Sequence, residues 1–232
     1  MRPTPKSLFG IKAVLFDLDD TLYPECAYVE SGFRAVSEHL AARFRLDADV
    51  ACASLLQILK EEGRGQVFNR FLRSHGIADE SVVPDLVSIY RSHRPGISLF
   101  PGVVSCLESL KQRRIRLGVV TDGLLVMQQN KVDALGLAQL VDSVVFTDSF
   151  GKPYWKPHKL PFQAALDALS MQPRETVFIG NDPAKDFPAP LALGMATIHV
   201  CSHEFLSGSC CPAHLHVTSI VDAVRSLSAL NS

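Results

Sequence analysis

Five short apolar runs, separated by segments with helical periodicity, constrain the fold of this chain more than any other feature. The runs occupy residues 11–17, 116–121, 143–147, 176–180 and 197–201. The segments with a helical pattern occupy residues 103–113, 124–135, 160–170, 184–193 and 219–230. Strands that alternate with helices predict an α/β fold, in which a parallel sheet has helices on both faces.

A different pattern fills the interval between the first and second runs. Apolar residues recur there at steps of three or four, beginning with Val29, Phe33, Val36, Leu40 and Phe44. This spacing is typical of one face of a helix and predicts a block of about four helices. We therefore expect a Rossmann-like core of residues 1–22 and 99–232, and an inserted α-helical domain of residues 23–98.

The composition narrows the possible classes of protein. Hydrophobic residues make up 47% of the 232 residues and charged residues 20%, which is typical of a globular protein with a sizeable core. A formal net charge of −1 argues against a nucleic acid polymer or an anionic membrane as the partner. No run approaches the roughly 18 consecutive apolar residues of a membrane span, and the first residues lack the apolar stretch of a signal peptide. We expect a cytoplasmic protein that is a monomer or a homodimer.

The cysteines offer a second possible site. None of the six forms a CxxC pair, so we expect them to be reduced. The stretch CCPAHLH, residues 210–216, contains both cysteine and histidine and can be read as a metal site. A surface loop near the C-terminus is the interpretation that the pattern favours.

Polar side chains gather at the ends of the predicted strands. They are Asp17 and Asp19 after the first strand, Thr121, Asp122 and Gly123 after the second, Lys156 after the third, and Asp182 and Asp186 after the fourth. Each alone is a common turn residue or helix cap. Together, in a parallel sheet, they meet at one edge, where ligands of such folds bind. Crowded carboxylates repel one another, so their juxtaposition indicates a bound cation or a reaction.

The residue types at this edge indicate the chemistry. Carboxylates suit a hard cation such as Mg²⁺. A cation, a lysine and a hydroxyl together suit a phosphoryl group, whose transfer depends on charge neutralisation and positioning.

Four motifs in order resemble those of the haloacid dehalogenase-like (HAD) hydrolase superfamily: DLDDT, Thr121, KPHKLPF and GNDPAKD. The resemblance covers the whole chain, because the helical block between the first two motifs resembles the first-type helical cap of these enzymes. It implies a Mg²⁺-dependent enzyme that forms an aspartyl phosphate.

The resemblance implies a role for each residue of the first motif. Asp17 would be the nucleophile, since a carboxylate can attack phosphorus when a metal and a lysine neutralise the phosphate. Asp19 would protonate the leaving alcohol and then activate water, and its backbone carbonyl would bind Mg²⁺.

The second and third motifs would hold the phosphate. Thr121 would donate to a phosphate oxygen, together with backbone N–H groups around Asp122 and Gly123. Lys156 would pair with the phosphate and with Asp17. Lys152 also precedes a proline, but only Lys156 is followed six positions later by an aromatic residue, Phe162, as is common in the superfamily.

The fourth motif would complete the metal site. Many relatives read Gly-Asp-Asn where this chain reads Gly180-Asn181-Asp182. Asp182 is the expected magnesium ligand because it is the carboxylate of the pair, with Asn181 as the alternative. Asp186 would orient Lys156 or a bound water.

Asp19 bears on the reaction type. Dehalogenases of the superfamily lack this second aspartate, since a halide needs no proton, whereas an alkoxide leaving group does. Asp19 therefore favours a phosphomonoester hydrolase. A phosphomutase would use the same core residues and remains an alternative. A binding or regulatory protein that has kept the fold is disfavoured because Asp17, Asp19 and Lys156 are all present.

The helical cap is expected to read the rest of the substrate. Its nearly balanced charge favours a small phosphorylated metabolite, such as a nucleoside monophosphate, phosphoglycolate or a sugar phosphate. Arg64, between two glycines, is a candidate substrate residue, with a solvated helix face as the alternative. Tyr23 is a second candidate and can equally pack beneath the cap.

Overall fold

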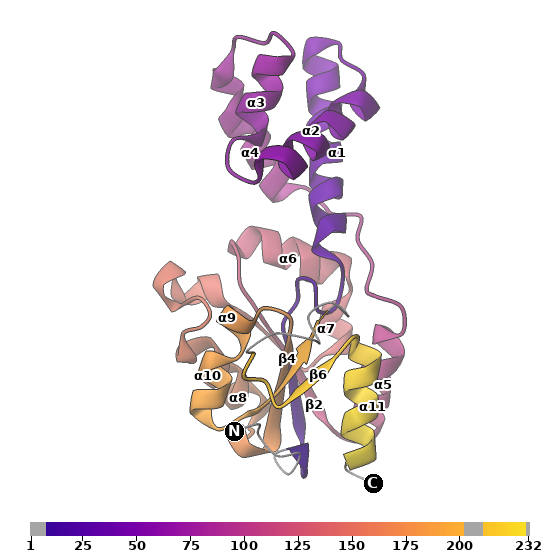
Figure 1. The fold of residues 1–232 in the computed structure, drawn as a ribbon, viewed down its shortest axis with the longest axis vertical. Coiled ribbons are helices and arrows are strands. Elements are labelled where there is room, and N and C mark those ends of the chain that lie inside the picture. The colour runs from indigo at the N-terminus through magenta and orange to yellow at the C-terminus, as the bar shows by residue number, and fades with distance from the viewer. Residues whose placement is uncertain (1–7, 202–210, 231–232) are drawn as a thin grey trace. The chain divides into compact units, whose positions relative to one another are not determined.

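The computed structural model describes residues 8–201 and 211–230. These residues form two compact units, one containing the chain up to Pro24 together with the chain from Ser98 onward, and one containing Glu25–Ile97 (Figure 1). We refer to them as the core unit and the helical unit.

The core unit is built on one six-stranded sheet. Its strands are β1 (Ala13–Phe16), β2 (Arg116–Thr121), β3 (Ser143–Phe146), β4 (Thr176–Gly180), β5 (Ala196–Val200) and β6 (Leu215–Val217). They lie in the order β3-β2-β1-β4-β5-β6, and every neighbouring pair is parallel. The strand order reverses at β1: β2 and β3 lie on one side of it, and β4, β5 and β6 lie on the other. Doubly wound sheets bind their ligands at this point of reversal, between β1 and β4.

Helices cover this sheet on both faces, as predicted. They are α5 (Val103–Gln112), α6 (Leu125–Ala134), α7 (Leu137–Leu140), α8 (Lys159–Leu169), α9 (Pro183–Asp186), α10 (Pro188–Leu193) and α11 (Ile220–Leu230). Helices α5 and α11 pack together, and α8 and α10 form a second pair (Figure 1). All residues of β1 and β4 are buried, since a parallel sheet covered on both faces excludes water from its central strands.

The helical unit has its own hydrophobic core. Its α-helices are α1 (Glu25–Phe44), α2 (Ala48–Glu62), α3 (Val67–Ser74) and α4 (Val83–Ser92). The predicted stripe of α1 is buried at Val29, Phe33, Val36 and Leu40. Asp47 caps α2 by accepting hydrogen bonds from two backbone N–H groups. The prediction of a four-helix block is confirmed.

The structure corrects two predicted elements. The single helix expected over residues 184–193 is divided into α9 and α10, because Pro188 cannot donate the backbone hydrogen bond that would continue the first helix. The loop expected over residues 210–216 contains the start of strand β6, which pairs with β5. Cys210 lies outside the described residues.

No helix in the described part of the chain combines the length and the apolar character that a membrane span requires.

Candidate active site

The predicted strand-end residues meet at the carboxyl edge of the three central strands. Asp17 directly follows β1, Thr121 ends β2, and Asn181 directly follows β4. The backbone of Asp17 continues the sheet by one hydrogen bond, from its N–H to the carbonyl of Ile179 at 2.9 Å. The chain then turns away through Asp20, whose φ of 52° lies in the left-handed region. Asp17 itself is only 6% exposed.

Lys156 joins two buried carboxylates in this site. Its Nζ lies 2.5 Å from Oδ1 of Asp17 and 2.8 Å from Oδ1 of Asp186. The other lysine considered from the sequence, Lys152, lies in an exposed turn of 3₁₀-helix. The parallel sheet therefore brings Asp17, Lys156 and Asp186 together from three separate parts of the chain.

Asp122 fixes the segment that carries Lys156. Its Oδ1 accepts hydrogen bonds from the backbone N–H of Lys156 at 3.0 Å and from the Thr147 hydroxyl at 2.7 Å. The carboxylate thus ties the end of β2 to the segment after β3. The sequence assigned only its backbone N–H to the site, so this contact of its side chain is an addition.

Burial shapes the electrostatics of the ion pair. Burial raises the pKa of Asp17 to about 7, while Lys156 acts in the opposite direction and Asp186 adds to the rise. Burial alone would lower the pKa of Lys156, but the charges of Asp17 and Asp186 raise it above its usual value. Lys156 therefore carries a positive charge at neutral pH, which offsets the charge of the carboxylates.

Asp186 is held by the loop after β4. Its Oδ2 accepts hydrogen bonds from the backbone N–H groups of Asn181 at 3.0 Å and Asp182 at 2.9 Å. Gly180 makes this approach possible, because a Cβ at that position would lie 2.3 Å from Oδ2 of Asp186. The glycine of the fourth motif is thus required by packing against the carboxylate.

The two candidates for the metal ligand of the fourth motif make different contacts in the structure. The Thr21 hydroxyl lies 3.3 Å from Oδ2 of Asp17 and 3.3 Å from Oδ1 of Asn181. These two oxygens therefore face the same hydroxyl. Asp182 instead caps α9, where its Oδ1 accepts a hydrogen bond from the N–H of Ala184 at 2.9 Å.

The donor set suits a hard cation. The Asp17 carboxylate, the Asn181 amide and the backbone carbonyl of Asp19 offer oxygen atoms, which are the ligands that Mg²⁺ prefers. One oxygen of Asp17 and the amide oxygen of Asn181 lie on the same hydroxyl, each 3.3 Å from the Thr21 oxygen. The residues present therefore fit the metal that the sequence predicts.

Asp19 is held by three side chains, and the sequence pointed to none of these contacts. Lys131 donates to its Oδ1 at 2.7 Å and Gln128 to its Oδ2 at 2.9 Å. The Tyr23 hydroxyl also donates to Oδ1. Gln128 donates in addition to the hydroxyl of Thr121 at 2.5 Å. One helix, α6, thus connects the predicted acid–base residue to the predicted phosphate-binding residue.

A signal for Gln128 and Lys131 was present in the sequence. Both are buried, on the same face of α6 as Val132 and at helical spacing from Leu135, which follows the helix. Polar residues on an apolar stripe that starts directly after a strand end indicate a site beneath the helix.

The two predicted substrate residues have different surroundings. Tyr23 is buried and contacts Asp19, as described above. The Arg64 side chain, which is 70% exposed, donates to Glu25 at 2.9 Å within the helical unit. Their roles in substrate binding stay predictions.

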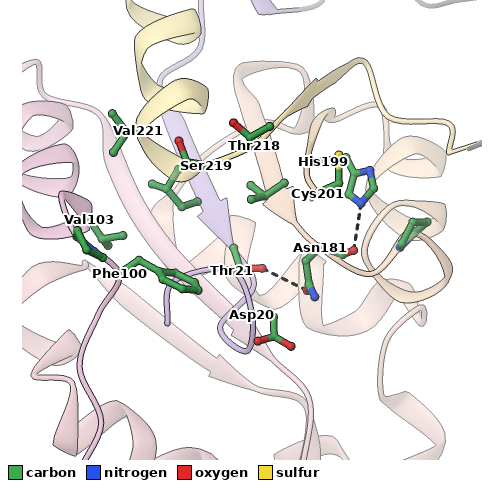
Figure 2. Close-up of a pocket in the computed structure, with 14 residues that line it drawn as sticks. Asp20, Thr21, Phe100, Val103, Asn181, His199, Cys201, Thr218, Ser219 and Val221 are labelled. Carbon is green, nitrogen blue, oxygen red and sulfur yellow. Dashed lines mark hydrogen bonds between the residues drawn. The ribbon is translucent and has the colours of Figure 1, made fainter. Parts of the chain in front are cut away.

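A cavity of about 490 Å³ lies beside the carboxyl edge of the sheet. Figure 2 shows Asp20, Thr21 and Asn181 on one side of it. Phe100 and Val103 line it as well, together with residues 218–221 at the start of α11. The core unit therefore has an open volume next to the site residues.

Comparison with known families decides the class of the protein. A family model described as haloacid dehalogenase-like hydrolase matches residues 14–200. The chain belongs to this family. The four motifs, the sheet order and the lysine between two carboxylates are thus features of a HAD-like hydrolase, and the predicted superfamily is confirmed.

Relatives of this hydrolase carry phosphatase names. Glyceraldehyde 3-phosphate phosphatase of Methanocaldococcus jannaschii is 32% identical over 202 residues, which cover 84% of this chain and 87% of the relative. Phosphoglycolate phosphatase of Rhodospirillum rubrum is 27% identical over 197 residues, which cover 81% and 78%. The chain is a phosphoric monoester hydrolase, as predicted.

Solved structures confirm the fold. The HAD-hydrolase YfnB of Bacillus subtilis matches with a TM-score of 0.67 at 17% identity, covering 96% of this chain and 99% of that one. A HAD-superfamily hydrolase of Geobacter sulfurreducens matches with a TM-score of 0.66 at 24% identity, covering 93% and 97%.

Proposed function

We propose that this HAD-like hydrolase is a Mg²⁺-dependent phosphatase that acts on a small phosphorylated metabolite, with Asp17 as the nucleophile. The observation that carries the proposal is the Lys156 ammonium between Asp17 and Asp186 at the end of β1. A carboxylate at this edge meets the phosphate of a bound ester, and the adjacent ammonium offsets the negative charge of both groups.

The first step forms a bond between an Asp17 oxygen and phosphorus and breaks the bond between phosphorus and the ester oxygen. Asp19 gives a proton to the departing alkoxide. In the second step Asp19 takes a proton from water, the water oxygen attacks phosphorus, and the bond to Asp17 breaks to release inorganic phosphate. Contacts at both oxygens of Asp19, from Lys131 and Gln128, support a fixed position for this proton transfer.

Thr121 has a hydroxyl hydrogen available for the phosphate. Its oxygen accepts a hydrogen bond from Gln128, so its own O–H bond is directed elsewhere. We propose that this O–H, the backbone N–H groups of Asp122 and Gly123, and the Lys156 ammonium bind the phosphate oxygens.

Asp17, the backbone carbonyl of Asp19 and a residue of the fourth motif would hold Mg²⁺. The contact between Thr21 and Asn181 supports Asn181 ahead of Asp182 for the third position. The metal, when bound, supplies positive charge that favours the approach of an anionic ester to an anionic nucleophile.

Small esters are the substrates to test first. The named relatives act on glyceraldehyde 3-phosphate and phosphoglycolate, and a ribulose-1,5-bisphosphate 5-phosphatase of Halopiger xanaduensis is 27% identical over 203 residues. These names share a short phosphorylated carbon chain, which supports a substrate of that size for this protein.

The proposal is tested by phosphate release from a panel of esters, with Mg²⁺ or with a chelator. The panel contains glyceraldehyde 3-phosphate, phosphoglycolate, a nucleoside monophosphate and a sugar phosphate. We expect release that requires Mg²⁺, is lost in Asp17→Asn and is retained in Asp167→Asn, an exposed carboxylate of α8. Release that persists in Asp17→Asn would refute the proposed nucleophile. A rearranged phosphate ester without release would indicate a phosphomutase.

A further inference from the structure

Three potential metal ligands meet at the far edge of the core sheet, on strands β5 and β6. One ligand atom each from His199, Cys211 and His216 lies within 4.8 Å of the other two. His199 and His216 are register partners on adjacent parallel strands, so their side chains project from the same face of the sheet. Their Nδ1 atoms are 3.2 Å apart. Cys211 joins them from the segment just before β6.

The hydrogen bonding of His199 leaves one ring nitrogen as a ligand. Its Nε2 lies 3.1 Å from the backbone carbonyl of Asn181 (Figure 2). A carbonyl oxygen can only accept, so Nε2 carries the hydrogen, and Nδ1 of the neutral ring has the lone pair. Histidines that bind metals usually donate the other N–H to a carbonyl or carboxylate in this way.

We propose that His199, Cys211 and His216 bind a borderline-soft divalent metal ion, with Zn²⁺ as the best match. Two nitrogen ligands of a tetrahedral zinc lie about 3.4 Å apart, and a nitrogen and a sulfur about 3.6 Å apart, given the usual bond lengths. The observed separation of the two Nδ1 atoms agrees with the first value. The widest separation in the cluster, at most 4.8 Å, needs to shorten by no more than about 1.2 Å to reach the second.

This site differs in chemistry from the one at Asp17. Its ligands are nitrogen and sulfur, which favour zinc and similar ions, whereas Asp17, Asp19 and Asn181 offer only oxygen. The two sites therefore select different metals from a mixture. His216 and Cys211 are half-buried, so an ion can reach them from solvent.

A bound ion would have two structural effects. It would join the edge strand β6 to β5 and to the segment that precedes β6. It would also fix the orientation of His199, whose Nε2–H holds the carbonyl of Asn181. The loop that carries the fourth motif would thereby be held at the carbonyl of Asn181, in addition to the contacts of its backbone N–H groups with Asp186.

Cobalt spectroscopy tests this proposal directly on the full chain. The metal-free protein is titrated with Co²⁺ in the presence of excess Mg²⁺, which occupies the oxygen site. We expect a thiolate-to-cobalt charge-transfer band and the intense visible bands of tetrahedral cobalt, with a stoichiometry of one ion per chain. Zn²⁺ should remove these bands by competition.

Matched variants identify the ligands. Cys211→Ser should abolish the charge-transfer band, and His216→Gln should weaken Zn²⁺ binding by at least about 100-fold, beyond the usual effect of losing a partner of a ligand. Cys106→Ser in α5 and His39→Gln in α1 should bind the metal as the wild type does. Circular dichroism checks that each variant is folded.

Two results would overturn the proposal. The first is the absence of a thiolate band in the wild type at saturating Co²⁺. The second is an unchanged band in folded Cys211→Ser together with unchanged Zn²⁺ affinity in His216→Gln. In either case the cluster is a hydrogen bond between two neutral imidazoles, with Cys211 packed against the neighbouring apolar residues.

Discussion

The buried charges at the carboxyl edge of the core sheet and the exposed charges of the helical unit are organised differently. At the carboxyl edge of the core sheet, one buried ammonium, Lys156, is shared by two buried carboxylates. In the helical unit, exposed arginines each pair with one carboxylate: Arg34–Asp49, Arg64–Glu25, Arg70–Glu62 and Arg73–Glu80.

The difference distinguishes charges that a reaction or a ligand uses from charges that water solvates. Exposed pairs are screened by water and contribute little to stability, so a chain can gain or lose them freely. Crowded buried charges cost desolvation energy and persist where a reaction or a ligand uses them. We therefore expect the crowded buried charges to carry the chemistry. Substitutions of these residues should lower stability and activity far more than substitutions of the exposed pairs.

The largest effect is expected at Lys156. Lys156→Met keeps the length of the side chain but leaves Asp17 and Asp186 buried without their counter-ion. We expect a loss of about 3–5 kcal/mol in the free energy of unfolding and no measurable phosphatase activity. Denaturant unfolding and phosphate release measure the two effects.

Lys185 is the matched control, since it also pairs with an aspartate but is exposed. Lys185→Met should shift the melting temperature by no more than about 2 °C. Similar losses of stability in the two variants would remove the distinction between buried, shared charges and exposed pairs.

A smaller effect on turnover is expected at Lys131, which holds Asp19. Lys131→Met should lower kcat/KM by about 100-fold for an alkyl phosphate, whose leaving group needs a proton. The loss should be smaller for p-nitrophenyl phosphate, whose leaving group is stable without one. Lys111→Met, an exposed lysine that donates to the carbonyl of Gln139, should leave both rates unchanged. Equal losses for the two esters in Lys131→Met would contradict a role through Asp19.

The raised pKa of Asp17 predicts a pH-dependent affinity for Mg²⁺. Because burial raises this pKa to about 7 in the metal-free protein, the carboxyl is protonated below that pH and must lose its proton to bind the metal. The affinity should fall about tenfold per pH unit below 7 and level off above it. Calorimetric titrations between pH 5.5 and 8.5 measure this. A constant affinity across the range would show that Asp17 is ionised throughout.

The smallest effect is expected in the helical unit. Arg64→Ala removes the exposed pair with Glu25 and should lower the melting temperature by no more than about 2 °C. A fall several times larger would place Arg64 among the residues that the fold needs. Thermal unfolding followed by circular dichroism distinguishes the two results.

Much of the fold could be predicted from local patterns. The predicted strands end within one residue of the ends of their apolar runs, because a central strand of a covered parallel sheet is apolar throughout. Strand β6 was missed because Leu215–Val217 is too short for a periodic pattern and is specified by its pairing with β5. The break between α9 and α10 was missed because the apolar pattern of residues 184–193 continues past Pro188, which ends the first helix.

The residues of the site could also be predicted only in part. Motifs at strand ends locate Asp17, Thr121, Lys156 and Asp186, since parallel topology alone brings those ends together. The apolar stripe of α6 places Gln128 and Lys131 on its buried face, but their contacts with Asp19 depend on how α6 packs against the sheet, which a local pattern does not specify. The preference for Asn181 over Asp182 likewise depends on loop geometry, because Asp182 uses its carboxylate to cap α9.

The central claim is that Asp17 is the buried carboxylate that forms a bond to phosphorus. The most direct test is a rapid acid quench during the first turnover of the fastest ester of the panel, labelled at phosphorus and mixed with the Mg²⁺-loaded enzyme. We predict a transient label on the protein that hydroxylamine releases, that peptide mapping assigns to Asp17, and that is absent in Asp17→Asn. Phosphate release without labelled protein at any time in the first turnover, or a label on another residue, would contradict the claim.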